Sequence, residues 1–112
     1  MKNISLTLVL VFNIFFSNSL FAYDQSSLTY IQGNLCSQAN NGSPVPGLLV
    51  SLVHQNLGRS VPVYTDNFGN FLMSNIPKTN VPYYLEVYWG ERLIYRNAVT
   101  ILAPVQLPRI CI

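Results

Sequence analysis

The stretch Tyr83-Tyr84-Leu85-Glu86-Val87-Tyr88-Trp89 carries the clearest structural signal in this chain of 112 residues. Apolar residues alternate in it with tyrosines and a glutamate, which is the period of a β-strand with one buried face. The alternation predicts one set of side chains pointing into the core (Leu85, Val87 and Trp89) and another pointing away from it (Tyr84, Glu86 and Tyr88). Gly90-Glu91 then predicts a turn into a second strand that begins at Arg92.

Away from this strand, the same period of two continues through most of the chain beyond residue 27. It predicts short strands at residues 28–36, 48–53, 61–65, 70–74, 83–89, 92–95, 98–102 and 105–112. Seven prolines and six glycines are scattered along the chain and argue against long helices, and no amphipathic helical pattern interrupts the segments. We therefore expect an all-β fold, a seven- to eight-stranded, antiparallel-rich β-sandwich.

Local residue choices add detail to this expectation. Gly33 in the first segment indicates a β-bulge. Asp66-Asn67-Phe68-Gly69 predicts a tight turn that completes a hairpin, with the aspartate bonding ahead to the backbone and the glycine at positive φ. Residues 56–60 are expected to form a loop, and residues 75–82, which contain two prolines, a second long connection.

Residues 1–22 have the three parts of a secretory signal: a charged start at Lys2, an apolar centre and a polar stretch that ends on Ala22. The apolar run is about 11 residues long, short of the roughly 20 that span a bilayer. We expect cleavage after Ala22, which leaves a short extension over residues 23–27 and one domain over residues 28–112. This product would be periplasmic or secreted and have no stable membrane anchor. An uncleaved N-terminal anchor is the alternative.

Charged side chains are scarce, at 9% of the residues, and the formal net charge is +2. Six lysines and arginines make no basic footprint, so we expect no nucleic-acid partner. Four carboxylates and a single histidine, His54, leave few groups for acid–base catalysis or metal binding. We expect no catalytic residues, no metal and no cofactor, and interpret His54 as a strand-end residue near a loop.

The only two cysteines, Cys36 and Cys111, lie 75 positions apart. In an exported protein pairing is the default, so we predict a disulfide between them. Closing so long a loop would stabilise the fold by roughly 4–4.5 kcal/mol in the chain-entropy model. The alternative, a reactive thiol, lacks a nearby histidine or basic cluster to lower its pKa.

Four segments follow one another in an order that is typical of one known domain family: Pro-Val-Pro-Gly-Leu-Leu-Val-Ser-Leu (44–52), Tyr-Thr-Asp-Asn-Phe-Gly-Asn-Phe (64–71), Asn-Ile-Pro (75–77) and Tyr-Leu-Glu-Val (84–87). Together they resemble the carboxypeptidase regulatory-like domain over about Leu28 to Ile101. The resemblance implies a transthyretin-like β-sandwich with Greek-key connections. In such sandwiches the first and last strands commonly lie side by side, which implies that Cys36 and Cys111 come within bridging range. Modules of this family usually serve as folding, spacing or binding units beside peptidases, in surface proteins or in outer-membrane receptors.

Tyrosine and arginine gather around the strand quoted at the start. Tyr84 and Tyr88 share its polar face, and the partner strand of the hairpin adds further candidates according to register: Arg92, Tyr95 and Arg96. Tyrosine and arginine are enriched at binding surfaces, because tyrosine offers a rigid apolar area with a polar tip. The alternative is that cross-strand tyrosine and arginine pairs only stabilise the sheet.

The sequence therefore predicts a non-catalytic exported binding or structural module that engages an unidentified protein or glycan of the bacterial envelope or medium. The alternative is a small secreted hydrolase or hydrolase inhibitor, with the connection at residues 75–82 as the inhibitory loop. Whether the domain forms a homo-oligomer, through a sheet edge or through the aromatic face, is left open.

Overall fold

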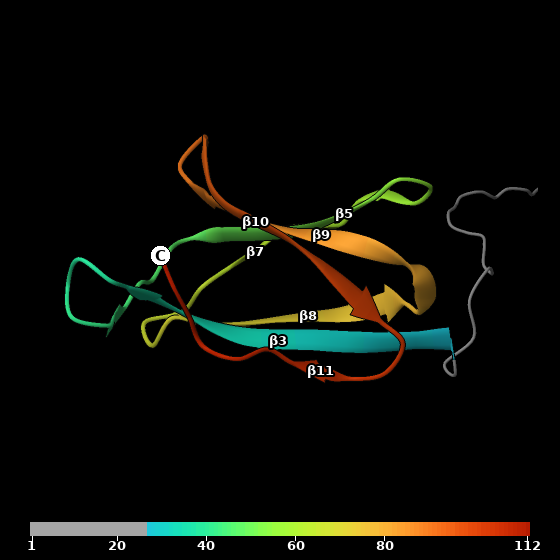
Figure 1. Cartoon of the computed structure of the whole chain (residues 1–112), viewed down its shortest axis with the longest axis horizontal. Helices are drawn as coiled ribbons and strands as arrows, with labels where there is room; N and C mark the ends of the chain where they lie inside the picture. Colours follow the sequence, from blue (N-terminus) through green and yellow to red (C-terminus); the bar gives the residue numbers. More distant parts are fainter. Residues whose placement is uncertain (1–26) are drawn as a thin grey trace, which may run out of the picture.

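A computed structural model describes residues 27–112, which form two facing layers of strands (Figure 1). The predicted signal sequence, residues 1–22, and residues 23–26 of the predicted extension lie outside the described residues. The strands are β3 (Leu28–Ser37), β4 (Ser43–Pro44), β5 (Leu49–His54), β6 (Gly58–Arg59), β7 (Val63–Tyr64), β8 (Asn70–Pro77), β9 (Thr79–Trp89), β10 (Arg92–Ile101), β11 (Val105–Gln106) and β12 (Ile110–Cys111). None of the described residues belongs to a helix that could cross a membrane.

The strands form two sheets, which we call sheet A and sheet B. Sheet A has the order β10-β9-β5, with β6 and β7 both paired to the other edge of β5. Sheet B is built around β3, which pairs antiparallel with β8 and β4 and parallel with β11 and β12. In Figure 1, β5, β9 and β10 form one layer and β3, β8 and β11 the other. The fold is therefore the predicted antiparallel-rich β-sandwich, although several of its strands are only two residues long.

The core lies between the layers and is made of side chains that alternate along the strands. The alternation is clear in β9, where Tyr83, Leu85 and Val87 are buried, and in β3, where Ile31 and Leu35 are buried. The complete cluster is Ile31, Leu35, Leu48, Val50, Leu52, Phe71, Met73, Ile76, Tyr83, Leu85, Val87 and Ile101. Burial of one such side chain contributes about 1.5–3 kcal/mol relative to exposure, so this layer is the main source of stability.

The disulfide joins the central strand of sheet B to the end of the chain. β12 runs parallel to β3 with Cys111 opposite Cys36, and the two Cα atoms are 4.3 Å apart. The bond between these residues confirms the predicted pairing. A disulfide of this kind is compatible with an oxidising compartment outside the cytoplasm.

The turn at residues 66–69 forms as predicted, but it does not close a hairpin. Asp66 Oδ1 accepts hydrogen bonds from the amides of Phe68 and Asn70, each at 2.9 Å, and Gly69 has a φ of 79°. The preceding strand β7 pairs with β5 in sheet A, whereas the following strand β8 pairs with β3 in sheet B. The turn therefore carries the chain from one sheet to the other.

Gly33 does not form the predicted bulge. It pairs in register with Phe71, and a Cβ atom at Gly33 would lie only 2.8 Å from Cε2 and Cζ of that ring. The bulge lies on β8, where Ser74 and Asn75 together stand opposite Tyr30, and Asn75 has a φ of 59°. Gly33 thus allows a close approach, which is the other common reason for a glycine inside a strand.

The predicted connection at residues 75–82 is almost entirely strand, and the predicted loop at residues 56–60 is partly strand. β8 continues to Pro77 and β9 begins at Thr79, so only Lys78 separates them, and an exposed loop at residues 75–82 is not part of the fold. Pro82 is tolerated because the pairing of β9 with β10 is irregular next to it, where a missing N–H interrupts no regular ladder. Residues 56–60 contain β6, which returns along β5 as a hairpin. The predicted strands 92–95 and 98–102 are continuous in β10.

Candidate binding face

The outer face of sheet A carries side chains that are aligned in rows across its strands. Residues directly opposite each other in an antiparallel pair point to the same side of the sheet. The pairing gives three neighbouring rows: Leu93, Tyr88, Leu49 and Tyr64; Arg96, Glu86 and Ser51; and Ala98, Tyr84, Val53 and Arg59. We call these residues the outer face. Among the described segments, none lies over this side of β5, β9 and β10 in Figure 1.

Glu86 lies at the centre of the outer face and is only 7% exposed. Its Oε1 accepts hydrogen bonds from Tyr88 Oη at 2.7 Å and from Arg59 Nη1 at 2.9 Å. Its Oε2 accepts one from Arg96 Nε at 3.2 Å. Arg59 Nη1 also donates to Ser51 Oγ at 2.9 Å. Glu86 is therefore the shared counter-ion of two arginines that come from different strands.

Both guanidinium groups also contact tyrosine rings. Arg96 Cζ lies 3.9 Å from the centroid of the Tyr84 ring, which is a close cation–π contact. Arg59 Cζ lies 6.0 Å from the centroid of the Tyr88 ring, near the outer limit for such a contact. Each guanidinium is thus positioned by a carboxylate and by an aromatic ring, which restricts two long side chains that would otherwise sample many rotamers.

The environment of Glu86 favours its ionised form. Burial raises the pKa of the Glu86 carboxyl group, but hydrogen bonds from Tyr88, Arg59 and Arg96 together with the charge of Arg59 outweigh burial, so the pKa lies below its usual value. The hydrogen bond to Glu86 raises the pKa of the Arg59 guanidinium in turn. The Glu86 carboxylate and the Arg59 guanidinium are therefore both charged at neutral pH.

The exposed charge of this network is positive. The side chain of Glu86 is 9% exposed, whereas those of Arg59 and Arg96 are 51% and 49% exposed. The negative partner is covered, and both positive partners face solvent. Such an arrangement presents N–H donors and positive charge to an incoming molecule, which suits groups that carry negative charge or accept hydrogen bonds.

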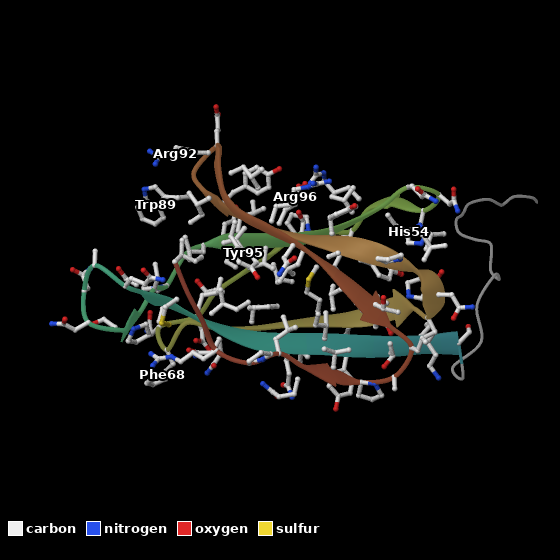
Figure 2. The ribbon with its side chains drawn as sticks, in the orientation of Figure 1. His54, Phe68, Trp89, Arg92, Tyr95 and Arg96 are labelled. Carbon is white, nitrogen blue, oxygen red and sulfur yellow. A yellow bond between two sulfur atoms is a disulfide. The ribbon has the colours of Figure 1, made fainter. Side chains whose placement is uncertain are left out.

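The structure brings together three of the five predicted surface residues. Tyr84, Tyr88 and Arg96 lie on the outer face, but Tyr95 and Arg92 do not. Tyr95 pairs with Val87 and packs against the core, and in Figure 2 it lies on the side of β10 that faces sheet B. Arg92 is exposed at the tip of the β9–β10 hairpin, beside Trp89 (Figure 2).

A bulge in β10 explains which side chain meets Glu86. Leu93 pairs with Tyr88 and Tyr95 pairs with Val87, so Ile94 is an extra residue between them. A shift of one residue exchanges the two faces of a strand. Regular pairing would have placed Tyr95 opposite Glu86, whereas the bulge places Arg96 there.

Trp89 was predicted to point into the core, and this prediction is wrong. It is 59% exposed, although Leu85 and Val87 of the same alternating set are buried. Trp89 is the last residue of β9 and pairs with Arg92, next to the turn at Gly90. The hairpin tip bends away from sheet B (Figure 2), so the alternation continues without a core to fill.

Sequence reasoning missed Arg59 and Ser51 as parts of the outer face. Ser51 lies on β5 opposite Glu86, and Arg59 lies on β6 opposite Val53. Residues 56–60 were expected to form a loop, which hid the register of Arg59. The available signal was Gly58, because a glycine four positions after His54 suits a hairpin with a three-residue loop.

His54 is the last residue of β5 and organises the β5–β6 hairpin. It is 4% exposed, and its Nδ1 accepts hydrogen bonds from the amides of Asn56 at 3.1 Å and Leu57 at 3.2 Å. Its ring also contacts Tyr83, with centroids 5.0 Å apart. This agrees with the interpretation of His54 as a strand-end residue. Within residues 27–112, no three potential metal ligands from His, Cys, Asp and Glu lie together.

A separate groove of about 520 Å³ opens between the sheets beside β8. Its walls include core side chains such as Leu52, Met73 and Ile76. Arg59 lies at this groove and also belongs to the outer face, so the two features meet at that residue.

No protein-family model matches this chain, and no curated protein matches it. The resemblance to the carboxypeptidase regulatory-like domain therefore stays a prediction. The structure itself establishes an all-β sandwich with a disulfide, and the candidate site rests on the geometry of the outer face.

Proposed function

We propose that this chain is a non-catalytic exported binding or structural module that engages a protein or glycan of the bacterial envelope or medium through the outer face of sheet A. The network of Arg59, Glu86 and Arg96 on an open sheet face carries this proposal. Ion pairs near a protein surface add little to stability, so fold stability alone is a weak reason to assemble three charges there in so sparsely charged a chain.

Three further features support an exported binding role. The disulfide fits a periplasmic or secreted protein, as does the predicted signal sequence at residues 1–22. The resemblance to carboxypeptidase regulatory-like domains points to a family of folding, spacing and binding units. Tyr88 and Tyr84 lie on either side of the row that holds Glu86 and Arg96, and tyrosine beside arginine is a common composition of binding surfaces.

The proposal is tested by capture from native envelopes and culture medium with the oxidised, exported protein as bait. The double variant Tyr88→Ala/Arg96→Ala should reduce recovery of a saturable partner about tenfold or more, because it removes an aromatic anchor and a charged anchor together. The matched control is Tyr30→Ala/Arg109→Ala, which removes the same two residue types from sheet B and the segment leading to its last strand. This control should capture as much partner as the wild type.

Thermal unfolding and circular dichroism must show that both double variants are folded before capture is compared. If the folded Tyr88→Ala/Arg96→Ala variant captures the same partner as the wild type to the same extent, the outer face is not the binding surface. Sedimentation of the wild-type protein in parallel tests whether the partner is a second copy of the chain.

A further inference from the structure

We propose that the outer face recognises an acidic segment of a protein partner, in which a carboxylate side chain is followed two residues later by an apolar one. This inference rests on the proposed binding function and names the chemistry of its ligand. The carboxylate would lie at Arg59 and Arg96, and the apolar side chain on the neighbouring row that contains Tyr88 and Leu93.

Charge complementarity favours an acidic ligand. Both oxygens of Glu86 already accept hydrogen bonds from the outer face, so its charge is satisfied internally. One buried negative charge thus accompanies two positive charges whose side chains are half exposed. An approaching partner meets the excess positive charge, which attracts carboxylates and repels basic segments.

The arginines retain donors for a ligand. In the described part of the chain, the hydrogen bonds of Arg59 run through Nη1 and that of Arg96 runs through Nε. The other guanidinium N–H groups are left to pair with an incoming carboxylate in the planar geometry that arginine favours. Because Glu86 and the tyrosine rings already hold both side chains, a ligand would order little further when it binds.

The apolar row beside Glu86, together with the covered ring of Tyr84, favours a protein over a glycan. Sugar binding commonly uses an open aromatic ring face, but the Arg96 guanidinium lies over the Tyr84 ring at 3.9 Å. The adjacent row instead offers apolar area: Leu93 is 44% exposed and Tyr64 is 65% exposed, on either side of Tyr88. Aliphatic side chains of a protein partner fit that row.

The row spacing matches an extended peptide. Glu86 and Tyr88 are two residues apart on β9, and a strand rises about 3.3 Å per residue, so the charged and apolar rows lie roughly 6.6 Å apart. An extended ligand has the same repeat, so its residues i and i+2 can face both rows. This period sets the sequence pattern expected of the partner.

The test uses the oxidised, exported protein and synthetic ten-residue peptides in which Glu and Leu alternate, separated by single Ser residues. The matched control peptides carry Gln in place of Glu. Isothermal titration should show at least tenfold tighter binding of the Glu peptides at low salt, with affinity falling as salt is raised. Arg59→Gln and Arg96→Gln should each weaken binding of the Glu peptides about tenfold, whereas Arg109→Gln should leave it unchanged.

Three results would overturn the assignment: equal binding of Glu and Gln peptides, no binding of either, or equal losses from Arg109→Gln and Arg96→Gln. Binding of polygalacturonate in an Arg59- and Arg96-dependent manner, without peptide binding, would reassign the ligand to an acidic glycan. The capture experiment with native envelopes distinguishes failure of this inference from failure of the proposed function. If capture still depends on the outer face but the acidic peptides do not bind, the binding function stands and only the acidic peptide ligand is rejected.

Discussion

The two sheets use arginine in different ways. In sheet B, Arg109 Nε donates to Asn34 Oδ1 at 3.0 Å, and Arg109 Nη2 donates to the carbonyl oxygen of Gly42. Asn34 Nδ2 donates in turn to the carbonyl oxygen of Phe68 at 2.9 Å. This network ties two turns and the last segment of the chain to β3. The hydrogen bonds of this network therefore have a structural role.

In sheet A, two arginines converge on one carboxylate in the middle of a sheet face. Arg59 and Arg96 contact Glu86, Ser51 and tyrosine rings, all on strands that backbone pairing already holds together. No turn or chain end in the described residues depends on these contacts. The polar network of sheet B thus holds turns and the chain end in place, whereas that of sheet A joins side chains on strands that are already paired, which is why we propose a binding role for it.

Removal of the disulfide should cause the largest loss of stability, because it opens a loop of 75 positions anchored in sheet B. We expect the double variant Cys36→Ala/Cys111→Ala to lose about 4 kcal/mol of unfolding free energy, chiefly through a freer unfolded chain. Urea unfolding followed by tryptophan fluorescence and circular dichroism measures this loss. A change below about 1 kcal/mol would contradict the view that the covalent link dominates the closure of sheet B.

Replacement of Glu86 should have a smaller effect on stability, because its arginine partners are half exposed. Glu86→Gln keeps the shape of the side chain but leaves two guanidinium groups without a counter-ion, and we expect a loss of about 1 kcal/mol after allowance for solvent screening. The matched control is Glu91→Gln at the exposed hairpin tip, which should change stability by less than about 0.5 kcal/mol. Equal effects of the two substitutions in urea unfolding would show that the Glu86 network adds nothing beyond an ordinary surface charge.

Sequence patterns predicted what depends on local chemistry. The alternation of residues 83–88, the Asp66–Gly69 turn and the pairing of Cys36 with Cys111 all follow from residue type and spacing, and the structure confirms them. The alternation follows from the spacing of apolar residues, the turn from the residue types within it, and the disulfide from the oxidising compartment that the predicted signal sequence implies. None of them requires knowledge of which strands become neighbours.

The errors concern long-range partners. The sequence does not reveal that β7 and β8 join different sheets, so the turn between them was expected to close a hairpin. Nor does it reveal the extra residue Ile94, which sends Tyr95 inward and Arg96 outward. Arg59 was missed because its side chain reaches Glu86 only once β6 pairs with β5. The candidate site was thus half predictable: the strand that carries Tyr84, Glu86 and Tyr88 was evident, but its arginine partners depend on register.

Acidification should cause the smallest of these changes in unfolding free energy, and it tests the Glu86 network of sheet A. The folded-state pKa of Glu86 is lowered below its usual value of 4.5, so its contribution is fully present above that pH and is lost as pH falls through the lowered pKa. We expect the wild type to lose more unfolding free energy than Glu86→Gln between neutral pH and the acid limit, because the variant has no carboxyl group to protonate at this position. Urea unfolding at successive pH values measures the unfolding free energy of both proteins, and the difference between their two curves removes the contributions of the other acidic groups.

Glu91→Gln should follow the wild-type curve, since Glu91 is exposed at the hairpin tip. A gap that stays constant down to the acid limit would mean that Tyr88, Arg59 and Arg96 do not stabilise the Glu86 carboxylate in the folded protein, and the outer face would then be less preorganised than its hydrogen bonds indicate.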